Sequence, residues 1–345
     1  MFERLVGNQR VKESLRRMLE ARRVPGALLF AGEDGVGKKR FALELAKAFN
    51  CRARVGVEAC GHCPACVRIE EFALPPTDEK DEYKKIIRSA HTDVGMVLPY
   101  KRAILVDAIR DLEREANFRP FEGEARIFLI EEADKLNEAS SNALLKTLEE
   151  PPATSHLILI TSRPAALLPT IRSRCQTIRF SPLTVAEIET QLVKDKSVAQ
   201  TDVPLLARAA RGSIGRALSL SADSYRAQRE AMLKVLSALV LTVDRVQLLR
   251  SAEELNDAKL KDEYEARLDV LETLVRDVWR LALDPKNAQI VNEDLREQLK
   301  MMAERTKAQS AARRLMEIEK LREQLAVNIN RKVTTDALFL GMASR

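Results

Sequence analysis

The spacing of apolar residues along the first half of the chain predicts strands that alternate with helices. Three short runs that are almost entirely apolar are typical of parallel strands buried on both faces, and they occupy residues 27–30, 127–130 and 157–161. Apolar residues recur at helical spacing in three other segments, residues 11–21, 41–49 and 137–150. Alternation of this kind predicts a doubly wound α/β sheet.

The second half of the chain carries only helical patterns. Just after Phe180, Thr184 is placed to be the N-cap of a helix, and Glu187 completes a capping box with it. Further on, apolar residues share one helical face, as do Leu268, Leu271, Leu274, Val275, Val278 and Leu281. We expect three domains, which are an α/β core over residues 1–180, a helical lid over 181–222 and an all-α domain over 223–345.

Composition and charge exclude some classes of protein but do not identify the function. The 345 residues are 46% hydrophobic, which is enough to fill several cores. The net charge of +6 permits attraction to nucleic acid but is far from the charge density of a protein that coats DNA. The chain starts without an apolar signal core, and its longest uncharged stretch, residues 151–162, is too short to span a bilayer. We expect a cytoplasmic protein with no membrane partner.

A cluster of cysteines is the first specific chemical signal. Cys51, Cys60, Cys63 and Cys66 have the spacing C-x8-C-x2-C-x2-C, which suits four thiolates on one tetrahedral Zn²⁺. Four protein ligands leave no position for an activated water, so the predicted zinc is structural rather than catalytic. His62 is a competing ligand, and ordinary free or redox-active cysteines are the alternative.

A glycine-rich loop follows the first predicted strand and precedes a helix, which is the context that a phosphate-binding loop requires. Gly32, Gly35, Gly37 and Lys38 match G-x-x-x-x-G-K, in which backbone N–H groups and the lysine bind phosphate oxygens. The match ends at Lys39, which stands where Ser or Thr would ligate Mg²⁺. The loop predicts the fold, while its magnesium chemistry is expected to be defective.

The second predicted strand ends in two acidic residues. Glu131 occupies the place of the Asp that usually orients magnesium, and Glu132 could align an attacking water. Adjacent acids after a strand are otherwise often solvated or cap a helix, and this alternative stays open.

Several segments together resemble the AAA+ subunits of bacterial DNA polymerase III clamp loaders. Residues 142–152, NALLKTLEEPP, are the most specific of these segments, and residues 5–8 resemble the adenine-proximal segment of the family. The cysteine segment 51–66 resembles the zinc knuckle of the γ/τ and δ′ subunits. The resemblance implies an AAA+ P-loop core with an inserted zinc knuckle, a small helical lid and an all-α collar domain that mediates oligomerisation.

The resemblance also implies roles for individual residues. Thr161 falls at the sensor-1 position of the family. Arg174 lies in a Ser-Arg-Cys motif, whose arginine acts in trans as an arginine finger on the ATP of the neighbouring subunit. A surface ion pair is the plainer interpretation of Arg174, and we expect Cys175 to be a small buried side chain.

The sequence departs from the ATP-hydrolysing members at three positions. Those members place an arginine third after Gly-Ser in the lid, where this chain has Gly215, with Arg216 one step later. Together with Lys39 and Glu131, this departure indicates the δ′ branch rather than the γ/τ motor. We expect no ATPase activity from the chain itself, and whether ATP or ADP still binds is left open. The alternative is an active AAA+ ATPase of the γ/τ type.

The implied partners are those of a clamp loader. They are γ/τ and δ subunits in a heteropentamer, the sliding clamp, and primer–template DNA. Five basic residues could contact DNA phosphates or form a solvated face, and they are Lys84, Lys85, Arg88, Lys101 and Arg102. An isolated zinc-dependent DNA-binding protein is a third, more remote hypothesis.

Overall fold

The computed structural model of the chain describes residues 2–195, 197–257, 263–326 and 330–343, and they form two compact units. The first unit comprises Met1–Val198 and Ala210–Leu218, and the second comprises Ala199–Ala209 and Ser219–Arg345. Helices of the predicted lid therefore belong to both units, and a separate lid domain stays a prediction.

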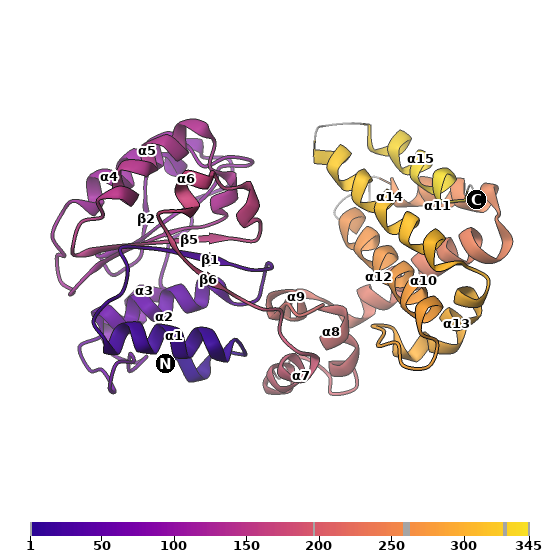
Figure 1. The fold of residues 1–345 in the computed structure, drawn as a ribbon, viewed down its shortest axis with the longest axis horizontal. Helices are drawn as coiled ribbons and strands as arrows, with labels where there is room; N and C mark the ends of the chain where they lie inside the picture. The colour runs from indigo at the N-terminus through magenta and orange to yellow at the C-terminus, as the bar shows by residue number, and fades with distance from the viewer. Residues whose placement is uncertain (1, 196, 258–262, 327–329, 344–345) are drawn as a thin grey trace. The chain divides into compact units, whose positions relative to one another are not determined.

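The first unit is built on a six-stranded sheet with the order β2-β3-β4-β5-β1-β6 (Figure 1). Every neighbouring pair is parallel except β2 and β3. The strands are β1 (Ala27–Ala31), β2 (Ile87–Arg88), β3 (Val94–Val97), β4 (Arg126–Ile130), β5 (Ser155–Thr161) and β6 (Gln176–Arg179). The predicted α/β sheet is confirmed, and its three apolar runs are the central strands β1, β4 and β5.

Helices cover both faces of this sheet (Figure 1). On one face lie α1 (Gln9–Glu20), α2 (Lys38–Asn50) and α3 (Pro64–Glu70), and on the other lie α4 (Val106–Ala116), α5 (Glu138–Glu149) and α6 (Pro169–Arg172). Alternate residues of one strand serve different cores, since Leu28 packs with Phe41 of α2 and Leu29 packs with Leu144 of α5. This two-sided burial explains the unbroken apolar runs at residues 27–31, 127–130 and 157–160 within the central strands.

The carboxyl ends of three central strands bring the predicted nucleotide residues to one edge of the sheet. Strand β1 leads into the glycine-rich loop and α2, β4 ends just before Glu131, and Thr161 is the last residue of β5. Because β4, β5 and β1 are parallel neighbours, these three positions are adjacent in space.

The segment after the sheet begins with a helix that has the predicted start. Thr184 caps α7 (Val185–Lys194), and its hydroxyl accepts a hydrogen bond from the Glu187 backbone while the Glu187 carboxylate accepts one from the Thr184 backbone. This capping box is confirmed. Two short helices, α8 (Val203–Ala209) and α9 (Ile214–Ser219), follow.

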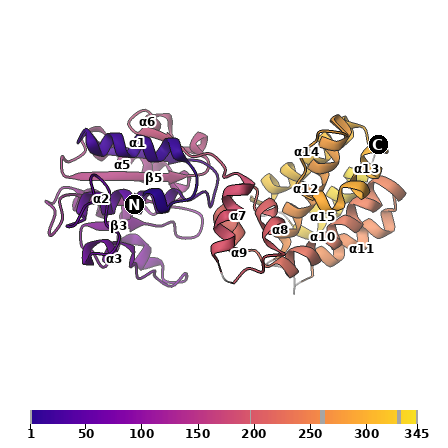
Figure 2. The ribbon, with the colours of Figure 1, turned by 90° about the horizontal axis from the view of Figure 1, so that it is seen from below.

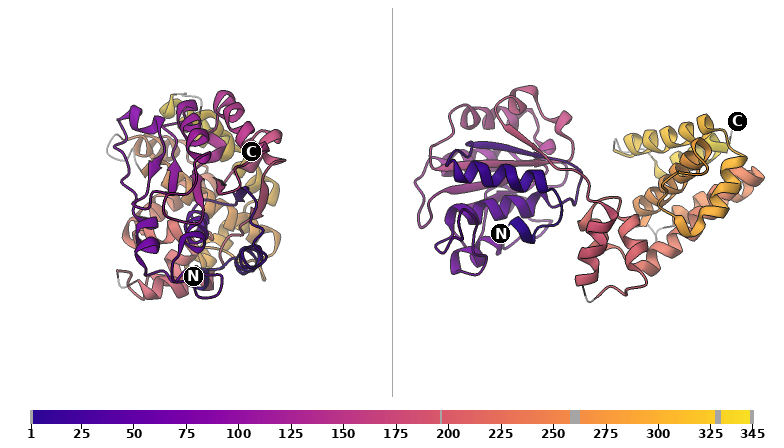
Figure 3. Two further views of the ribbon diagram at one scale, coloured as in Figure 1. Left: turned by 90° about the vertical axis from the view of Figure 1, so that its left-hand side faces the viewer. Right: turned by 60° about the horizontal axis from the view of Figure 1, so that its bottom comes forward.

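The second unit is helical throughout the part that the structure describes (Figures 2 and 3). Besides α8, its helices are α10 (Ala222–Ser237), α11 (Arg245–Leu255), α12 (Tyr264–Leu283), α13 (Arg296–Glu304), α14 (Ala308–Ala326) and α15 (Arg331–Ala343). The predicted apolar face of α12 is buried at each of its positions, from Leu268 to Leu281. Among the described residues, no helix is long and apolar enough to cross a membrane.

Shorter turns connect these elements. Five are 3-10 turns, η1 (Phe2–Arg4), η2 (Lys80–Lys84), η3 (Ala133–Lys135), η4 (Pro164–Ala166) and η7 (Glu293–Leu295), and η5 (Ala238–Thr242) is a π turn.

Candidate functional site

All the predicted nucleotide residues except Gly32 line one cavity of about 290 Å³ in the first unit. Its polar wall contains Gly35, Gly37, Lys38, Lys39, Glu131, Glu132 and Thr161. Gly35 and Gly37 have φ values of 74° and 98°, a conformation that only glycine adopts readily, so the loop needs glycine at both places. The structure thus brings together the strand ends and the loop that the sequence singled out.

The rest of the cavity wall is largely apolar. Leu5 and Val6 come from the segment that resembles the adenine-proximal region, and Ile214 and Leu218 come from α9. An apolar wall beside a phosphate-binding loop suits a flat base attached to a charged tail.

Lys38 is held inside the loop by its own backbone. Its ammonium donates hydrogen bonds to the carbonyl oxygens of Gly32 and Glu33 at 2.6 and 2.7 Å, and Asp34 lies 3.7 Å away. Burial lowers the pKa of Lys38 below its ordinary value. Gly32 therefore acts through its carbonyl group, while Gly35 and Gly37 shape the cavity itself.

Lys39 forms an ion pair with Glu131, with 3.1 Å between Nζ and Oε1. The Glu131 side chain is mostly buried, and Lys39 is about half exposed at the cavity. In an active P-loop site, the residue after the loop lysine and the acid at the strand end both serve the magnesium ion. Here these two positions hold an ammonium and a carboxylate that pair with each other, so a cation stands where the hydroxyl ligand of magnesium would be.

The remaining acidic residues of the site are paired within the chain. Glu132 lies 2.6 Å from the ammonium of Lys135, and its backbone is left-handed, with a φ of 46°. The Thr161 hydroxyl donates to Asp134 at 2.6 Å, and Arg163 also pairs with Asp134. An attacking water would have to compete with Lys135 for Glu132.

The lid residue Gly215 contacts the phosphate loop directly. Its backbone N–H donates to the carbonyl of Gly35 at 3.0 Å, and a Cβ atom added to Gly215 would lie 3.1 Å from the Gly35 Cα. A larger residue at this position would require the loop or the lid helix to shift by a few tenths of an ångström.

The four predicted zinc ligands converge in a separate cluster. Their sulfur atoms all lie within 4.8 Å of one another, with 3.6 Å between Cys51 and Cys60, 3.8 Å between Cys51 and Cys63, and 4.0 Å between Cys60 and Cys66. Tetrahedral zinc–thiolate bonds of about 2.3 Å place sulfur atoms about 3.8 Å apart. The cluster is thus the right size for one metal ion and far too open for disulfides.

Backbone donors support thiolates in this cluster. The N–H groups of Ala53 and Cys60 point to the Cys51 sulfur at 3.4 and 3.3 Å, and the Cys63 N–H points to the Cys60 sulfur at 3.3 Å. His62 instead uses Nδ1 against the Cys60 carbonyl at 3.1 Å, so this nitrogen is not directed at the cluster.

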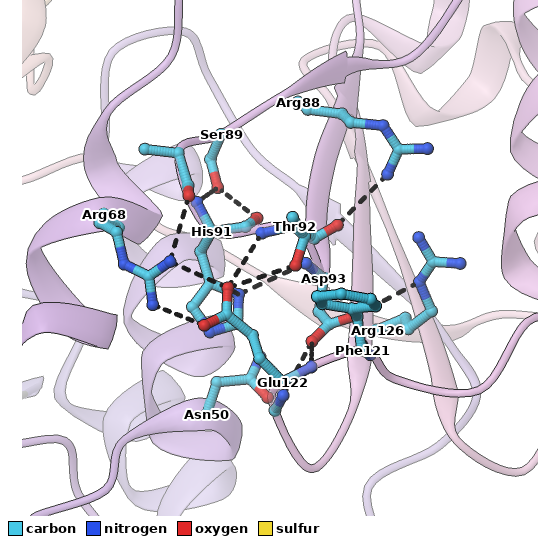
Figure 4. Close-up of polar contacts among 12 residues, drawn as sticks. Asn50, Arg68, Arg88, Ser89, His91, Thr92, Asp93, Phe121, Glu122 and Arg126 are labelled. Atoms are coloured by element: carbon cyan, nitrogen blue, oxygen red, sulfur yellow. Dashed lines mark hydrogen bonds and ion pairs between the residues drawn. The ribbon is translucent and has the colours of Figure 1, made fainter.

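Two acidic side chains tie the cysteine segment to the rest of the first unit. Glu58 accepts a hydrogen bond from the Phe2 backbone at 3.1 Å and pairs with Arg16 of α1 at 2.5 Å. Arg68 of α3 forms a two-pronged ion pair with Glu122 (Figure 4). This pair lowers the pKa of Glu122 to about 2, because the guanidinium donates to the ionised carboxylate.

A buried carboxylate that the sequence analysis missed holds the loop before β4 in place. Asp93 is fully buried and accepts hydrogen bonds from the backbone of Phe121, Glu122 and Gly123 at 2.7 to 2.9 Å (Figure 4). The Asn50 side chain accepts two more, from Glu124 and Ala125. No local pattern marks Asp93, because its partners lie far along the chain.

The predicted arginine finger lies at the end of α6 and is paired within the chain. Arg174 donates to the Thr170 carbonyl at 3.0 Å and to Glu149 of the NALLKTLEEPP segment at 2.6 Å. A third of the Arg174 side chain is exposed. Cys175 is buried as expected, and burial raises the pKa of its thiol to about 12.

Some of the five basic residues considered for DNA contact also have partners in the chain. Lys84 pairs with Asp81 and Arg88 pairs with Glu115, both at 2.6 Å, and the Lys101 ammonium lies 5.1 Å from the centre of the Tyr100 ring. These contacts fit a solvated face, and DNA contact by these residues stays a prediction.

Family comparisons cover most of the chain. A family model described as "DNA polymerase III, delta subunit" matches residues 7–184, and one described as "DNA polymerase III, delta subunit, C terminal" matches residues 225–339. DNA polymerase III subunit delta′ of Bacillus subtilis is 30% identical over 93% of this chain and 92% of its own length. The delta′ subunit of Escherichia coli is 29% identical over 95% and 92%.

Other similarities are more distant or more partial. The tau subunit of DNA polymerase III from E. coli is 33% identical over 74% of this chain, which corresponds to 38% of tau. Among solved structures, a gamma subunit-related protein of Thermotoga maritima aligns over 96% of this chain and 98% of its own, with 22% identity and a TM-score of 0.42.

Proposed function

We propose that this chain, which belongs to the delta′ family of DNA polymerase III subunits, is a non-motor subunit of a clamp loader. Its task is to serve the ATP site of a neighbouring subunit. In this role it assembles with γ/τ and δ subunits into a heteropentamer. The assembly opens a sliding clamp and places it on primer–template DNA.

The observation that carries the proposal is the Lys39–Glu131 ion pair at the position where an active site would hold magnesium. The direct contact of Gly215 with Gly35 adds a second obstacle, because no arginine reaches the phosphates from that lid position. A chain with both features can keep the AAA+ architecture while its own catalytic machinery is incomplete.

Arg174 is the residue that we assign to the neighbouring site. It is partly exposed and paired with Glu149, and an exposed pair of this kind is weak enough to exchange for a phosphate in a complex. A guanidinium suits this task because its planar donors match phosphoryl oxygens.

The cysteine cluster has a structural role in this proposal. One Zn²⁺ held by Cys51, Cys60, Cys63 and Cys66 closes the loop between α2 and α3. Through Glu58 the same segment fixes Phe2 and α1, so the metal stabilises the N-terminal part of the core rather than taking part in chemistry.

ATP turnover by the purified chain tests the non-motor assignment. We expect no hydrolysis above background with Mg²⁺ and ATP, because the position for magnesium is occupied by the Lys39 ammonium. A matched Lys38→Ala protein should give the same background rate. If the purified chain instead turned over ATP at a rate typical of motor subunits, and Lys38→Ala abolished that rate, the chain would be an active ATPase of the γ/τ type.

A further inference from the structure

The position of the Lys39 ammonium has a consequence for ligand binding that differs from simple loss of function. Its Nζ lies 3.1 Å from Glu131 at the edge of a cavity that still has a glycine loop, a loop lysine and an apolar wall. The cavity therefore retains the parts that bind a base and its phosphates. This cavity differs from an active P-loop site in the cation that lies beside the phosphates.

We propose that the cavity binds a nucleoside di- or triphosphate without a divalent metal, and that Lys39 supplies the counter-charge that Mg²⁺ supplies elsewhere. This proposal deepens the proposed function, on which it rests for the nature of the site. Glu131 holds the ammonium on one side, as this carboxylate would hold a hydrated magnesium ion in an active site. The Lys39 side chain is otherwise about half exposed. The exposed side is available to a phosphate oxygen.

The balance of charge in the cavity supports binding of an anion. Four cationic side chains line it, from Arg4, Lys38, Lys39 and Arg40, against three anionic ones, from Asp34, Glu131 and Glu132. Glu132 is also paired with Lys135, which does not line the cavity. The electrostatic potential at the loop is therefore more positive than the count of lining residues indicates. Free nucleotide carries more negative charge than its magnesium complex, and like charges repel strongly in a partly buried site.

Lys38 provides a second reason to expect a polyphosphate. Its ammonium is nearly fully buried, and its present acceptors are the carbonyl oxygens of the loop itself. A bound phosphate can replace these carbonyls as the acceptor with a stronger, charge-assisted hydrogen bond. Binding thus requires the Lys38 ammonium to exchange its present carbonyl acceptors for the phosphate.

The test is a titration of the full-length chain with a fluorescent ADP analogue, once with excess EDTA and once with excess Mg²⁺. We expect binding in EDTA and weaker binding in Mg²⁺, by about threefold or more, because the metal complex brings a second cation against Lys39. If the ADP analogue instead bound about tenfold more weakly in EDTA than in Mg²⁺, as expected for a metal-dependent site, the proposal would be overturned. An absence of binding in both conditions would overturn it as well.

Two variants make the test specific for Lys39. Lys39→Thr returns a hydroxyl to the magnesium position, so binding should become weaker in EDTA than in Mg²⁺, the reverse of the parent protein. Arg40→Ala is the matched control, because Arg40 lines the same cavity one residue later and is exposed. It should shift both affinities in parallel. If Lys39→Thr left the ratio of the two affinities unchanged, the ammonium would not be the counter-charge.

Failure here is distinguishable from failure of the proposed function. The role of Arg174 is measured by the clamp-loading activity of the assembly, which needs no nucleotide in this chain's own cavity. An assembly that depends on Arg174 and contains a chain without nucleotide affinity would refute only the inference about Lys39.

Discussion

An assembly that contains Arg174→Ala should load clamps poorly, although the variant chain itself should fold and join the complex. An arginine finger contributes about 10³ to 10⁵ in rate at the site that it serves. Because other subunits have their own sites, total ATP turnover should fall only in part. Clamp loading needs all sites to act together, so its rate should fall more than turnover does. Both rates are measured on reconstituted complexes with DNA and clamp present.

Two control variants separate this role from a local structural one. Arg172→Ala removes an exposed arginine two residues earlier, at the end of α6, and it should have a smaller effect. Glu149→Gln breaks the ion pair of Arg174 but keeps the guanidinium, so clamp loading should persist. If the Glu149 variant lost as much activity as Arg174→Ala, the ion pair itself would be the important feature. Unchanged loading with Arg174→Ala would contradict the assignment.

Replacement of Cys63 by Ser should release the metal and destabilise the first unit. We expect one zinc per chain in the parent protein and close to none in the variant, since three thiolates hold zinc much less tightly than four. The free energy of unfolding should drop by roughly 3 kcal/mol, because the segment that fixes Phe2 and α1 loses its anchor. Metal analysis and chemical denaturation measure the two effects.

The fifth cysteine provides the control for this experiment. Cys175 is buried outside the cluster, so Cys175→Ala should keep the full zinc content even though it removes a buried sulfur. A parent protein purified without chelator that contained almost no zinc would refute the metal assignment. Equal zinc content in the parent and in Cys63→Ser would show that Cys63 is not a required ligand.

Local sequence patterns were sufficient to predict the strands that are buried on both faces. The strands β1, β4 and β5 contain continuous apolar runs because each faces two cores, and the capping box of α7 lies within four consecutive residues. The strands β2, β3 and β6 were not predicted. Strand β2 has two residues, β3 has four with a glycine among them, and β6 is an edge strand with one buried residue in four.

The candidate sites also combine features that could be predicted from local sequence with contacts that could not. Cysteine spacing and the glycine loop were readable because their chemistry depends on residues that are close in sequence. The contacts that define the site join distant positions, as when Lys39 meets Glu131 or Gly215 meets Gly35. The network around Asp93 is of this second kind, and so is the pairing of Arg174 with Glu149. Such pairs follow from the packing of the sheet and its helices, which no local pattern contains.

Clamp loading by a reconstituted complex, with and without this chain, shows whether the chain works as a clamp-loader subunit. Clamp, primed DNA, and γ/τ and δ subunits from the same source are mixed with ATP, and closed clamps on DNA are counted. We expect that loading requires the chain and is restored when purified chain is added back, although that chain hydrolyses no ATP alone. Equal loading in its absence would contradict the assignment of this protein as a working subunit of the clamp loader.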